Sequence, residues 1–303
     1  MLEDPVARCN ELTHSGSLQL RKGEFKEAVE TFRETLRLAE SIEDRVLVSR
    51  AHCNISTALL ALGQVQEAEK GLRAILLNSR DSQSIFIASS NLASALRRQG
   101  KPQKALFYAR RALRACEPLD NALWKATCHN LLGNIYLSMS YLDDATSEYR
   151  TALSISQKGG LGTSYPVDYI KECLGYCTLL KRRYRQGIAL ILEAQSIADA
   201  NGNVRCLVEC YQDLSFAYMQ LKELPRAEEY GLKALKVAEE RGYLDILKNC
   251  YYLLGEIYLL MGDEAKSDLY LDRLQALYPH LAVLKDFLKT FDVSNIINLK
   301  NPF

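Results

Sequence analysis

The residues with the most evident potential for metal chemistry are two pairs of cysteines. Cys173 and Cys177 are four residues apart, and so are Cys206 and Cys210. In a helix this spacing places both members of a pair on one face. Thiolates arranged in this way can bind a metal such as zinc. A thiol is also a small apolar group that packs well in a protein core, so the pattern has two interpretations.

Other chemistry has weaker support in the sequence. The chain contains no HExxH pattern, no Ser/His/Asp order and no paired-carboxylate cleft that would indicate hydrolysis. The glycine-rich stretch at 159–162 lacks the lysine and the Ser/Thr of a phosphate-binding loop, so it is interpreted as a connector. We therefore expect no enzymatic activity, no catalytic residue, no cofactor and no metal site.

The composition excludes several classes of partner. The chain has 303 residues, with 38 basic and 37 acidic side chains and a net charge of +1. This balance does not favour nucleic acid, which usually binds a strongly basic protein. No apolar run approaches 18 residues and no targeting segment is evident at the N-terminus, so no membrane partner is expected. Nine scattered cysteines are typical of reduced thiols, and they predict a cytoplasmic protein.

A strong internal repeat organises the chain. A small residue recurs every 37 to 42 positions, and each is followed twelve positions later by a second small residue. Seven such pairs at one offset are very improbable by chance, and self-similarity at a fixed period indicates a repeat architecture. The pairs are Gly16/Ala28, Ser56/Ala68, Ala93/Ala105, Gly133/Ala145, Gly175/Gly187, Ser215/Ala227 and Gly255/Ser267.

This spacing predicts a helical hairpin in each repeat. Small residues on two amphipathic helices allow their axes to approach closely, while leucines and aromatic residues fill the flanking spaces. Glycines lie at the expected turns, where they can end the first helix, at Gly23, Gly63, Gly100 and Gly262. A single hairpin cannot bury its own apolar face, so neighbouring hairpins must stack.

The repeat resembles that of the tetratricopeptide repeat family. Gly133 and Tyr136, followed by Ala145, Tyr149 and Ala152, match the pattern of that family well. The tryptophan of the pattern is absent from every copy, and the period is longer than the usual 34 residues. Long-period arrays of this kind are similar to those of kinesin light chains, cell-polarity scaffolds and bacterial peptide receptors. The resemblance implies an all-α fold, an α-α superhelix with a right-handed solenoid of seven hairpins.

The expected organisation has four parts. Residues 1–158 hold hairpins one to four, 159–166 form a glycine-rich connector, 167–279 hold hairpins five to seven, and 280–303 form a capping helix and a tail. The capping helix is expected at about 281–291. Ile296, Ile297 and Leu299 give the tail apolar character, and the sequence leaves open whether the tail folds back onto the repeats.

The repeat register also decides how the cysteines are interpreted. Cys128, Cys210 and Cys250 lie five residues before the first small residue of their repeats. Other repeats carry an apolar residue at this position, so we favour packing over metal binding. The residues at the equivalent position elsewhere are Ala51, Ala88 and Ile170.

The resemblance further implies that first helices line a concave groove, at positions three before and one after the first small residue. Short hydroxyl and amide side chains occupy these positions early in the chain, and aromatic and acidic ones occupy them later, with Glu209 and Glu256 nearby. Asparagine amides can bind a peptide main chain whatever its sequence. The predicted groove residues are Thr57, Ser90, Ser94, Arg97, Asn130, Asn134, Glu172, Tyr176, Gln212 and Phe216.

Two functions are favoured by this interpretation, ahead of a third, a cryptic enzyme or regulatory subunit whose activity depends on a partner. The first is a scaffold or adaptor that binds a peptide or a helical segment of a protein partner in the groove. The second is a regulator whose superhelix closes when a small peptide binds. A repeat fold alone does not identify the partner, and the oligomeric state is open.

Overall fold

The structure is a computed structural model that describes residues 4–22, 24–162, 166–281, 283–291, 293 and 298–300. The predicted connector residues 163–165 and the tail residues Ile296 and Ile297 lie outside these ranges. Every regular element in the described residues is a helix. The predicted all-α, repeat-type fold is therefore confirmed. None of the described helices is long and apolar enough to cross a membrane.

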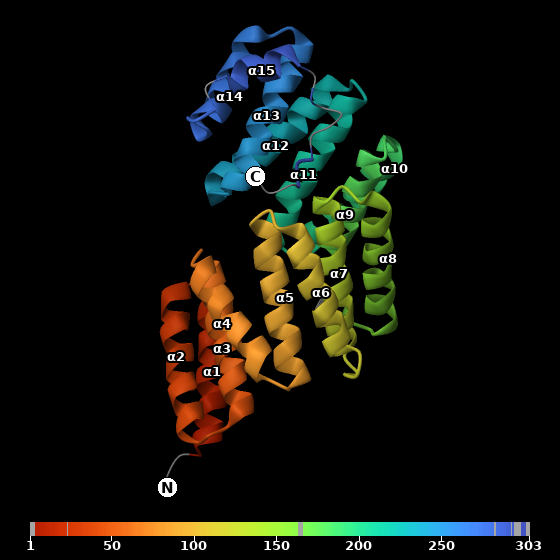
Figure 1. The fold of residues 1–303 in the computed structure, drawn as a ribbon. Helices are drawn as coiled ribbons and strands as arrows, with labels where there is room; N and C mark the ends of the chain where they lie inside the picture. The colour runs from red at the N-terminus through yellow and green to blue at the C-terminus, as the bar shows by residue number, and fades with distance from the viewer. Residues whose placement is uncertain are drawn as a thin grey trace. The chain divides into compact units, whose positions relative to one another are not determined.

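Within each of the two units described below, successive helices pack as neighbours (Figure 1). Most are 14 to 18 residues long. They are α1 (Pro5–Lys22), α2 (Phe25–Ser41), α3 (Arg45–Ala61), α4 (Val65–Asn78), α5 (Ser82–Arg98), α6 (Pro102–Cys116), α7 (Ala122–Ser138), α8 (Leu142–Lys158), α9 (Val167–Leu180), α10 (Tyr184–Ala200), α11 (Val204–Gln220), α12 (Leu224–Arg241), α13 (Leu244–Met261), α14 (Glu264–Leu277) and α15 (Leu284–Thr290).

The described residues form two compact units, one ending at Met139 and the other beginning at Ser140. In the first unit α1 packs on α2, α3 on α4 and α5 on α6. In the second unit α9 packs on α10, α11 on α12 and α13 on α14. Helix α8 also packs on α9, so the glycine-rich connector joins two helices of the same unit. The predicted separation of hairpins one to four from hairpins five to seven at residues 159–166 stays a prediction.

The small residues of the repeat lie where two helices come closest. All fourteen are buried. A Cβ atom on Gly175 would lie 2.5 Å from Cγ1 of Ile191 and 3.1 Å from the carbonyl oxygen of Gly187. Two of the serines that replace glycine bond to the partner helix: Ser215 Oγ donates to the carbonyl oxygen of Ala227 at 2.8 Å, and Ser267 Oγ donates to that of Gly255 at 2.9 Å. The twelve-residue offset is therefore the sequence signature of close helix packing.

The turns inside the hairpins share a left-handed residue. It stands seven positions after the first small residue, and glycine occupies it at Gly63, Gly100 and Gly262. Gly23 lies outside the described residues. Ser140, Arg182 and Lys222 adopt the same conformation, with φ near 60°, although side chains disfavour it. The repeat geometry is therefore imposed by packing even where the turn residue is unfavourable.

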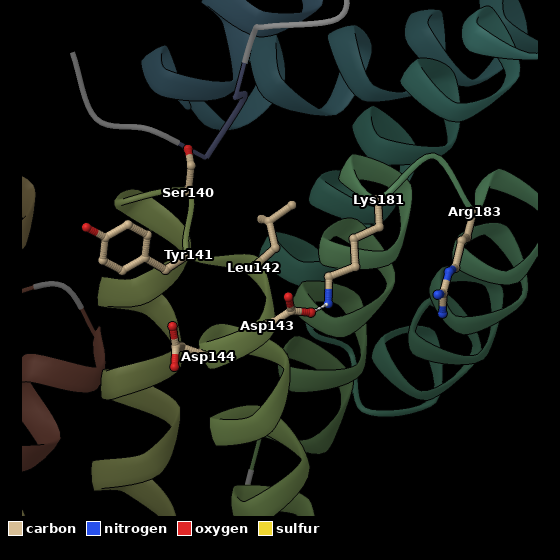
Figure 2. Close-up of a pocket in the computed structure, with 7 residues that line it drawn as sticks. All are labelled: Ser140, Tyr141, Leu142, Asp143, Asp144, Lys181 and Arg183. Atoms are coloured by element: carbon tan, nitrogen blue, oxygen red, sulfur yellow. Dashed lines mark hydrogen bonds and ion pairs between the residues drawn. The ribbon is translucent and has the colours of Figure 1, made fainter.

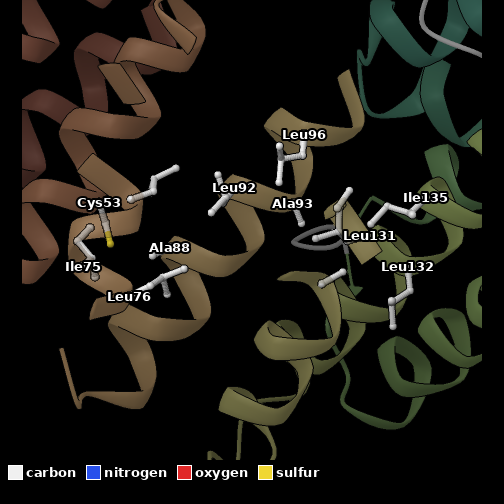
Figure 3. Packing of buried hydrophobic residues seen from close by; sticks show 13 residues of the cluster. Cys53, Ile75, Leu76, Ala88, Leu92, Ala93, Leu96, Leu131, Leu132 and Ile135 are labelled. Atoms are coloured by element: carbon white, nitrogen blue, oxygen red, sulfur yellow. The ribbon is translucent and has the colours of Figure 1, made fainter. Parts of the chain in front are cut away.

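Each unit has its own apolar core. In the first unit, leucines from α5 and α7 pack with residues of α4 and α6 around Leu92, Leu96 and Leu131 (Figure 3). In the second unit, Leu254 and Tyr258 of α13 pack with Leu235 of α12. These cores fix the first helices of neighbouring hairpins beside one another and leave their remaining face for other contacts.

The predicted capping helix is shorter than expected. Instead of 281–291 it covers only Leu284–Thr290, because the chain turns before it and Phe291 is extended. The Gln275 side chain holds this turn by donating to the carbonyl oxygen of Leu281 at 2.7 Å. Helix α15 packs on α14, where Lys289 pairs with Asp268 at 3.0 Å and Leu288 is buried.

We predict that Gly175→Ala lowers the free energy of unfolding by about 1–2 kcal/mol. The new methyl group overpacks the contact with Gly187, which costs about 1–3 kcal/mol, and the better helix propensity of alanine returns less than about 1 kcal/mol. Urea unfolding followed by circular dichroism measures the change.

Gly71→Ala is the matched control. A Cβ atom at this helical glycine meets only the rotatable hydroxyl of Ser56, at 3.0 Å. We expect this variant to be as stable as wild type or more stable. Equal stabilities of the two variants would show that the helix contact at Gly175 has room for a methyl group, which contradicts the prediction.

Candidate functional site

The first helices of the second unit present one continuous face. Helix α11 packs against both α9 and α13. Glu172 and Tyr176 on α9, and Gln212 and Phe216 on α11, are four residues apart in each pair, so each pair shares a helical face. The rings of Tyr176 and Phe216 are 6.5 Å apart and connect the two helices. All four side chains are buried, which requires that something cover this face.

Part of the cover is a segment near the C-terminus. Residues Asn298–Lys300, here called the tail segment, lie against α9, α11 and α13. The segment is a turn, in which the Lys300 N–H donates to Oδ1 of Asn298 at 3.0 Å. Leu299 at its centre is only 5% exposed. The chain therefore places a short piece of itself on the predicted binding face.

The helices bind the main chain of the tail segment on both sides of Leu299. Its N–H donates to the hydroxyl of Tyr176 at 2.7 Å. Its carbonyl oxygen accepts from Nδ2 of Asn249 on α13 at 3.0 Å. The same amide group donates to Oε1 of Gln212 at 3.0 Å, which orients it. These contacts involve atoms that every residue possesses, so they bind a peptide independently of its side chains.

The side chain of Lys300 enters a cage of three carboxylates. Its Nζ donates to Oε1 of Glu172 and lies 3.4 Å from Oδ2 of Asp213 and 3.5 Å from Oε2 of Glu209. The ammonium also lies 5.4 Å from the centre of the Tyr176 ring, close enough for a cation–π contact. The side chains of Glu172 and Asp213 are fully buried.

The charges of this cage depend on one another. Burial alone raises the pKa of Glu172, but the Lys300 ammonium outweighs it, so this pKa lies below its usual value. Burial raises the pKa of Asp213 well above its usual range, and the neighbouring Glu172 adds to the effect. Burial alone lowers the pKa of Lys300, but the carboxylates outweigh it and raise this pKa well above its usual value. Lys300 therefore keeps its charge in the cage.

The third carboxylate has a second cation. Arg205 Nε donates to Oε1 of Glu209 at 2.7 Å, one helical turn away on α11. The guanidinium of Arg205 also pairs with Asp245 at the start of α13. Glu209 therefore interacts with Arg205 at the edge of the site and with Lys300 at its centre.

The predicted groove residues of the first unit lie on α3, α5 and α7. Thr57 Oγ1 donates to the carbonyl oxygen of Cys53 at 2.9 Å and accepts from Nδ2 of Asn91 at 2.8 Å, which connects α3 with α5. Ser94 is half-buried on α5, one helical turn after Ser90. Helices α3 and α5 pack on each other, so these residues belong to one surface region.

Three other predicted residues of the first unit carry buried polar atoms without a partner. They are Oγ of Ser90, Nε of Arg97 and Oδ1 of Asn130, none of which forms a hydrogen bond in the described part of the structure. Asn134 is half-buried on α7, one turn after Asn130. A buried polar atom left unpaired costs about 1–3 kcal/mol, so these atoms favour a polar ligand.

Sequence reasoning missed three members of the second site. Asp213 adjoins the predicted Gln212, and Asn249 stands three residues before Tyr252 on the same face of α13. Asp213 also lies one helical turn after Glu209, so both residues could have been found by searching one turn from the residues near the predicted groove. Lys300 lies 128 residues from Glu172, and no periodic signal connects the two.

Surface depressions elsewhere are less suited to binding chemistry. One of about 520 Å³ surrounds the start of α8 (Figure 2), where Asp143 pairs with Lys181 at 2.7 Å. Asp143 is 98% exposed, so this pair is weakened by water. None of the lining residues is buried: Ser140, Tyr141, Leu142, Asp143, Asp144, Lys181 and Arg183. A second cavity, of about 250 Å³, lies beside α11, α13 and α15.

The nine cysteines are free and buried, as the packing interpretation requires. The Cys173 thiol donates to Oε2 of Glu172 at 3.3 Å, so it supports the carboxylate cage. Burial raises the pKa of Cys53, Cys177 and Cys250 to about 12. No group of three or more potential metal ligands occurs in the described ranges of the chain.

The fold and this site define a helical-repeat protein. Models of the tetratricopeptide repeat match residues 12–46, 84–158, 207–241 and 249–280, which together are more than half of the chain. The chain belongs to the tetratricopeptide repeat family, as the resemblance in its sequence predicted. No curated protein sequence matches it.

Solved structures show the same fold at low sequence identity. A Rap protein complexed with competence and sporulation factor has a TM-score of 0.71 at 14% identity, covering 94% of this chain and 79% of that chain. BtubC (BKLC) from P. vanneervenii has a TM-score of 0.56 at 21% identity, covering 73% and 90%. Aspartyl phosphate phosphatase F from Bacillus subtilis has a TM-score of 0.59 at 15% identity, covering 92% and 86%.

We expect native cysteines to react slowly with a thiol reagent. With pKa values of about 12, only about one in ten thousand of the Cys53, Cys177 and Cys250 thiols is ionised at pH 8, and burial limits access to all nine cysteines. Mass spectrometry after iodoacetamide at pH 8 should show little labelling of the native chain and nine labels in guanidinium. Ser147→Cys, on the exposed face of α8, should add one rapid label. Rapid labelling of the unmutated chain would contradict the buried placement.

We predict that Lys300→Ala destabilises the protein more at pH 8 than at pH 5. Without the ammonium, burial raises the pKa of Glu172 above its usual 4.5, so the folded state retains a proton that the unfolded state releases. Stability of the variant then falls as pH rises above 4.5, whereas wild type keeps its ion pair. The loss at pH 8 should be about 1.5–3 kcal/mol in urea unfolding, the range for a hydrogen bond to a charged group.

The control is Lys289→Ala, which removes a more exposed lysine paired with Asp268. Its effect should stay within about 1 kcal/mol and be the same at both pH values. A Lys300→Ala loss that does not change between pH 5 and pH 8 would refute the buried cage.

Proposed function

We propose that this protein is a non-enzymatic interaction scaffold that binds a peptide segment of a protein partner on the faces of its first helices. The observation that carries the proposal is the tail segment. Its main chain is bound through Tyr176 and Asn249, and both donor and acceptor of Leu299 are paired. A surface that binds a segment of its own chain in this way has the chemistry needed to bind a segment of another.

The first unit supports the same function from a different observation. Ser90, Arg97 and Asn130 carry a hydroxyl, a guanidinium and an amide with buried atoms that have no partner in the described residues. A peptide main chain supplies donors and acceptors that match these groups. We therefore assign the first-unit surface to an external partner.

The comparisons add support at the level of the fold. The Rap structure with competence and sporulation factor is of a protein complexed with another molecule, and it has the same fold as this chain. Tetratricopeptide repeats are generally interaction scaffolds, and the helices of this chain serve packing and surface display. The partner that we propose is a protein rather than a nucleic acid, because the net charge is only +1.

Affinity capture with quantitative mass spectrometry tests this proposal. We expect a partner retained by wild type to be lost, at least tenfold, from Asn130→Ala/Asn134→Ala, because both asparagines lie on the first-helix face. Lys104→Ala/Arg114→Ala changes two exposed residues of the second helix α6 and should retain the partner. Retention by the asparagine variant together with loss from the α6 variant would move the binding surface to the second helices and refute the proposal.

A further inference from the structure

The carboxylate cage of the second unit is built for a single cation. Three acidic side chains converge on one ammonium group, and two of them are fully buried. An ammonium has three N–H donors on a flexible stem, so it can contact three carboxylates that approach from α9 and α11. The planar fork of arginine suits one or two carboxylates in its own plane and does not fit this arrangement as well.

We propose that the face of α9, α11 and α13 is a recognition site for protein segments that carry a lysine directly after an aliphatic residue, and that the tail segment occupies it as an internal competitor. This inference rests on the proposed function, because it specifies the ligand that one of the two surfaces selects.

One set of contacts binds the main chain of the segment, and a second set binds the lysine side chain. Tyr176 and Asn249 bind the main chain on either side of Leu299 and set the register. The carboxylate cage then binds the side chain of the residue that follows Leu299 and favours a cation there. A neutral residue in place of lysine leaves buried acids without a cation, and such uncompensated groups are costly. The main-chain contacts therefore accept many sequences, whereas the cage selects a positively charged side chain.

The aliphatic residue has its own place. Leu299 is buried, so its side chain is removed from water when the segment docks. The turn formed by Asn298 directs the lysine side chain toward the cage. The preferred ligand is accordingly Asn-Leu-Lys or a segment of the same shape, in which asparagine at the first position favours the turn.

Because the tail segment occupies the site, an external ligand needs a higher affinity or a higher concentration to bind. A tethered segment competes at an effective concentration in the millimolar range, which a free segment must exceed by affinity or by additional contacts. Removing the Lys300 side chain should therefore open the site without altering the helices that form it.

The test uses the full-length chain and a fluorescent peptide that spans residues 293–303. We expect fluorescence anisotropy to show that Lys300→Ala binds this peptide at least tenfold more tightly than wild type does. A second peptide with alanine in place of its lysine should bind Lys300→Ala at least tenfold more weakly than the first. A third peptide with arginine at that place should rank between them.

Leu299→Ser provides an independent way to open the site. It removes the buried aliphatic side chain of the tail segment and leaves the carboxylates and Lys300 in the chain. It should also bind the first peptide more tightly than wild type does. Glu172→Gln combined with Lys300→Ala should remove most of the preference for lysine over alanine in the peptide.

Each negative outcome has its own meaning. Equal binding of the lysine and alanine peptides to Lys300→Ala would refute selection of lysine and leave peptide binding by this surface intact. No binding of any peptide to either opened variant would refute the whole inference about the second unit. The proposed function would still be tested independently by the affinity-capture experiment, in which the Asn130→Ala/Asn134→Ala variant probes the first-unit surface.

Discussion

The close approach of two helices at the small residues of each repeat is the constraint on which the other features depend. At Gly175 and Gly187 the backbones are so near that an added methyl group would lie within 3.1 Å of the facing carbonyl oxygen and would overlap the side chain of Ile191 or Leu179. Because helix contacts at this distance interlock, the relative position of the two helices in a hairpin is fixed. The left-handed turn residue follows from this geometry, and lysine, arginine and serine accept the conformation where glycine is absent.

Fixed hairpins in turn determine what the first helices can do. Their small-residue faces pack on the second helices, so their other face is free for polar and aromatic side chains. In the first unit this face carries polar atoms that lack partners within the described residues, and in the second unit it carries buried acids. The same architecture thus displays two different chemical surfaces, one suited to main-chain hydrogen bonding and one suited to a cation.

Buried ion pairs contribute less to stability than their number suggests, because each charge must first leave water. Their usual effect is to give one conformation, in which every buried charge is paired, a much lower free energy than conformations that leave a charge unpaired. The cage around Lys300 has this character, since Glu172 and Asp213 are fully buried and only a cation at their centre balances the local charge. The Cys173 thiol and the Asn249 amide complete the surroundings and orient the groups that meet the tail segment.

The sequence by itself determined the helices, the hairpin register and part of the binding face. Small residues at an offset of twelve predict close helix contacts, and helical spacing then places Glu172 with Tyr176 on one helical face and Gln212 with Phe216 on another. These are local properties, because neighbours along a helix are set by its period. Only the tertiary structure decided that Asp213 and Asn249 join them and that Lys300 is the cation at the centre. That contact spans 128 residues and has no periodic signature, since it depends on where the chain returns after α15. The short cap and the unit boundary at residue 139 have the same origin, because the packing of whole helices decides them.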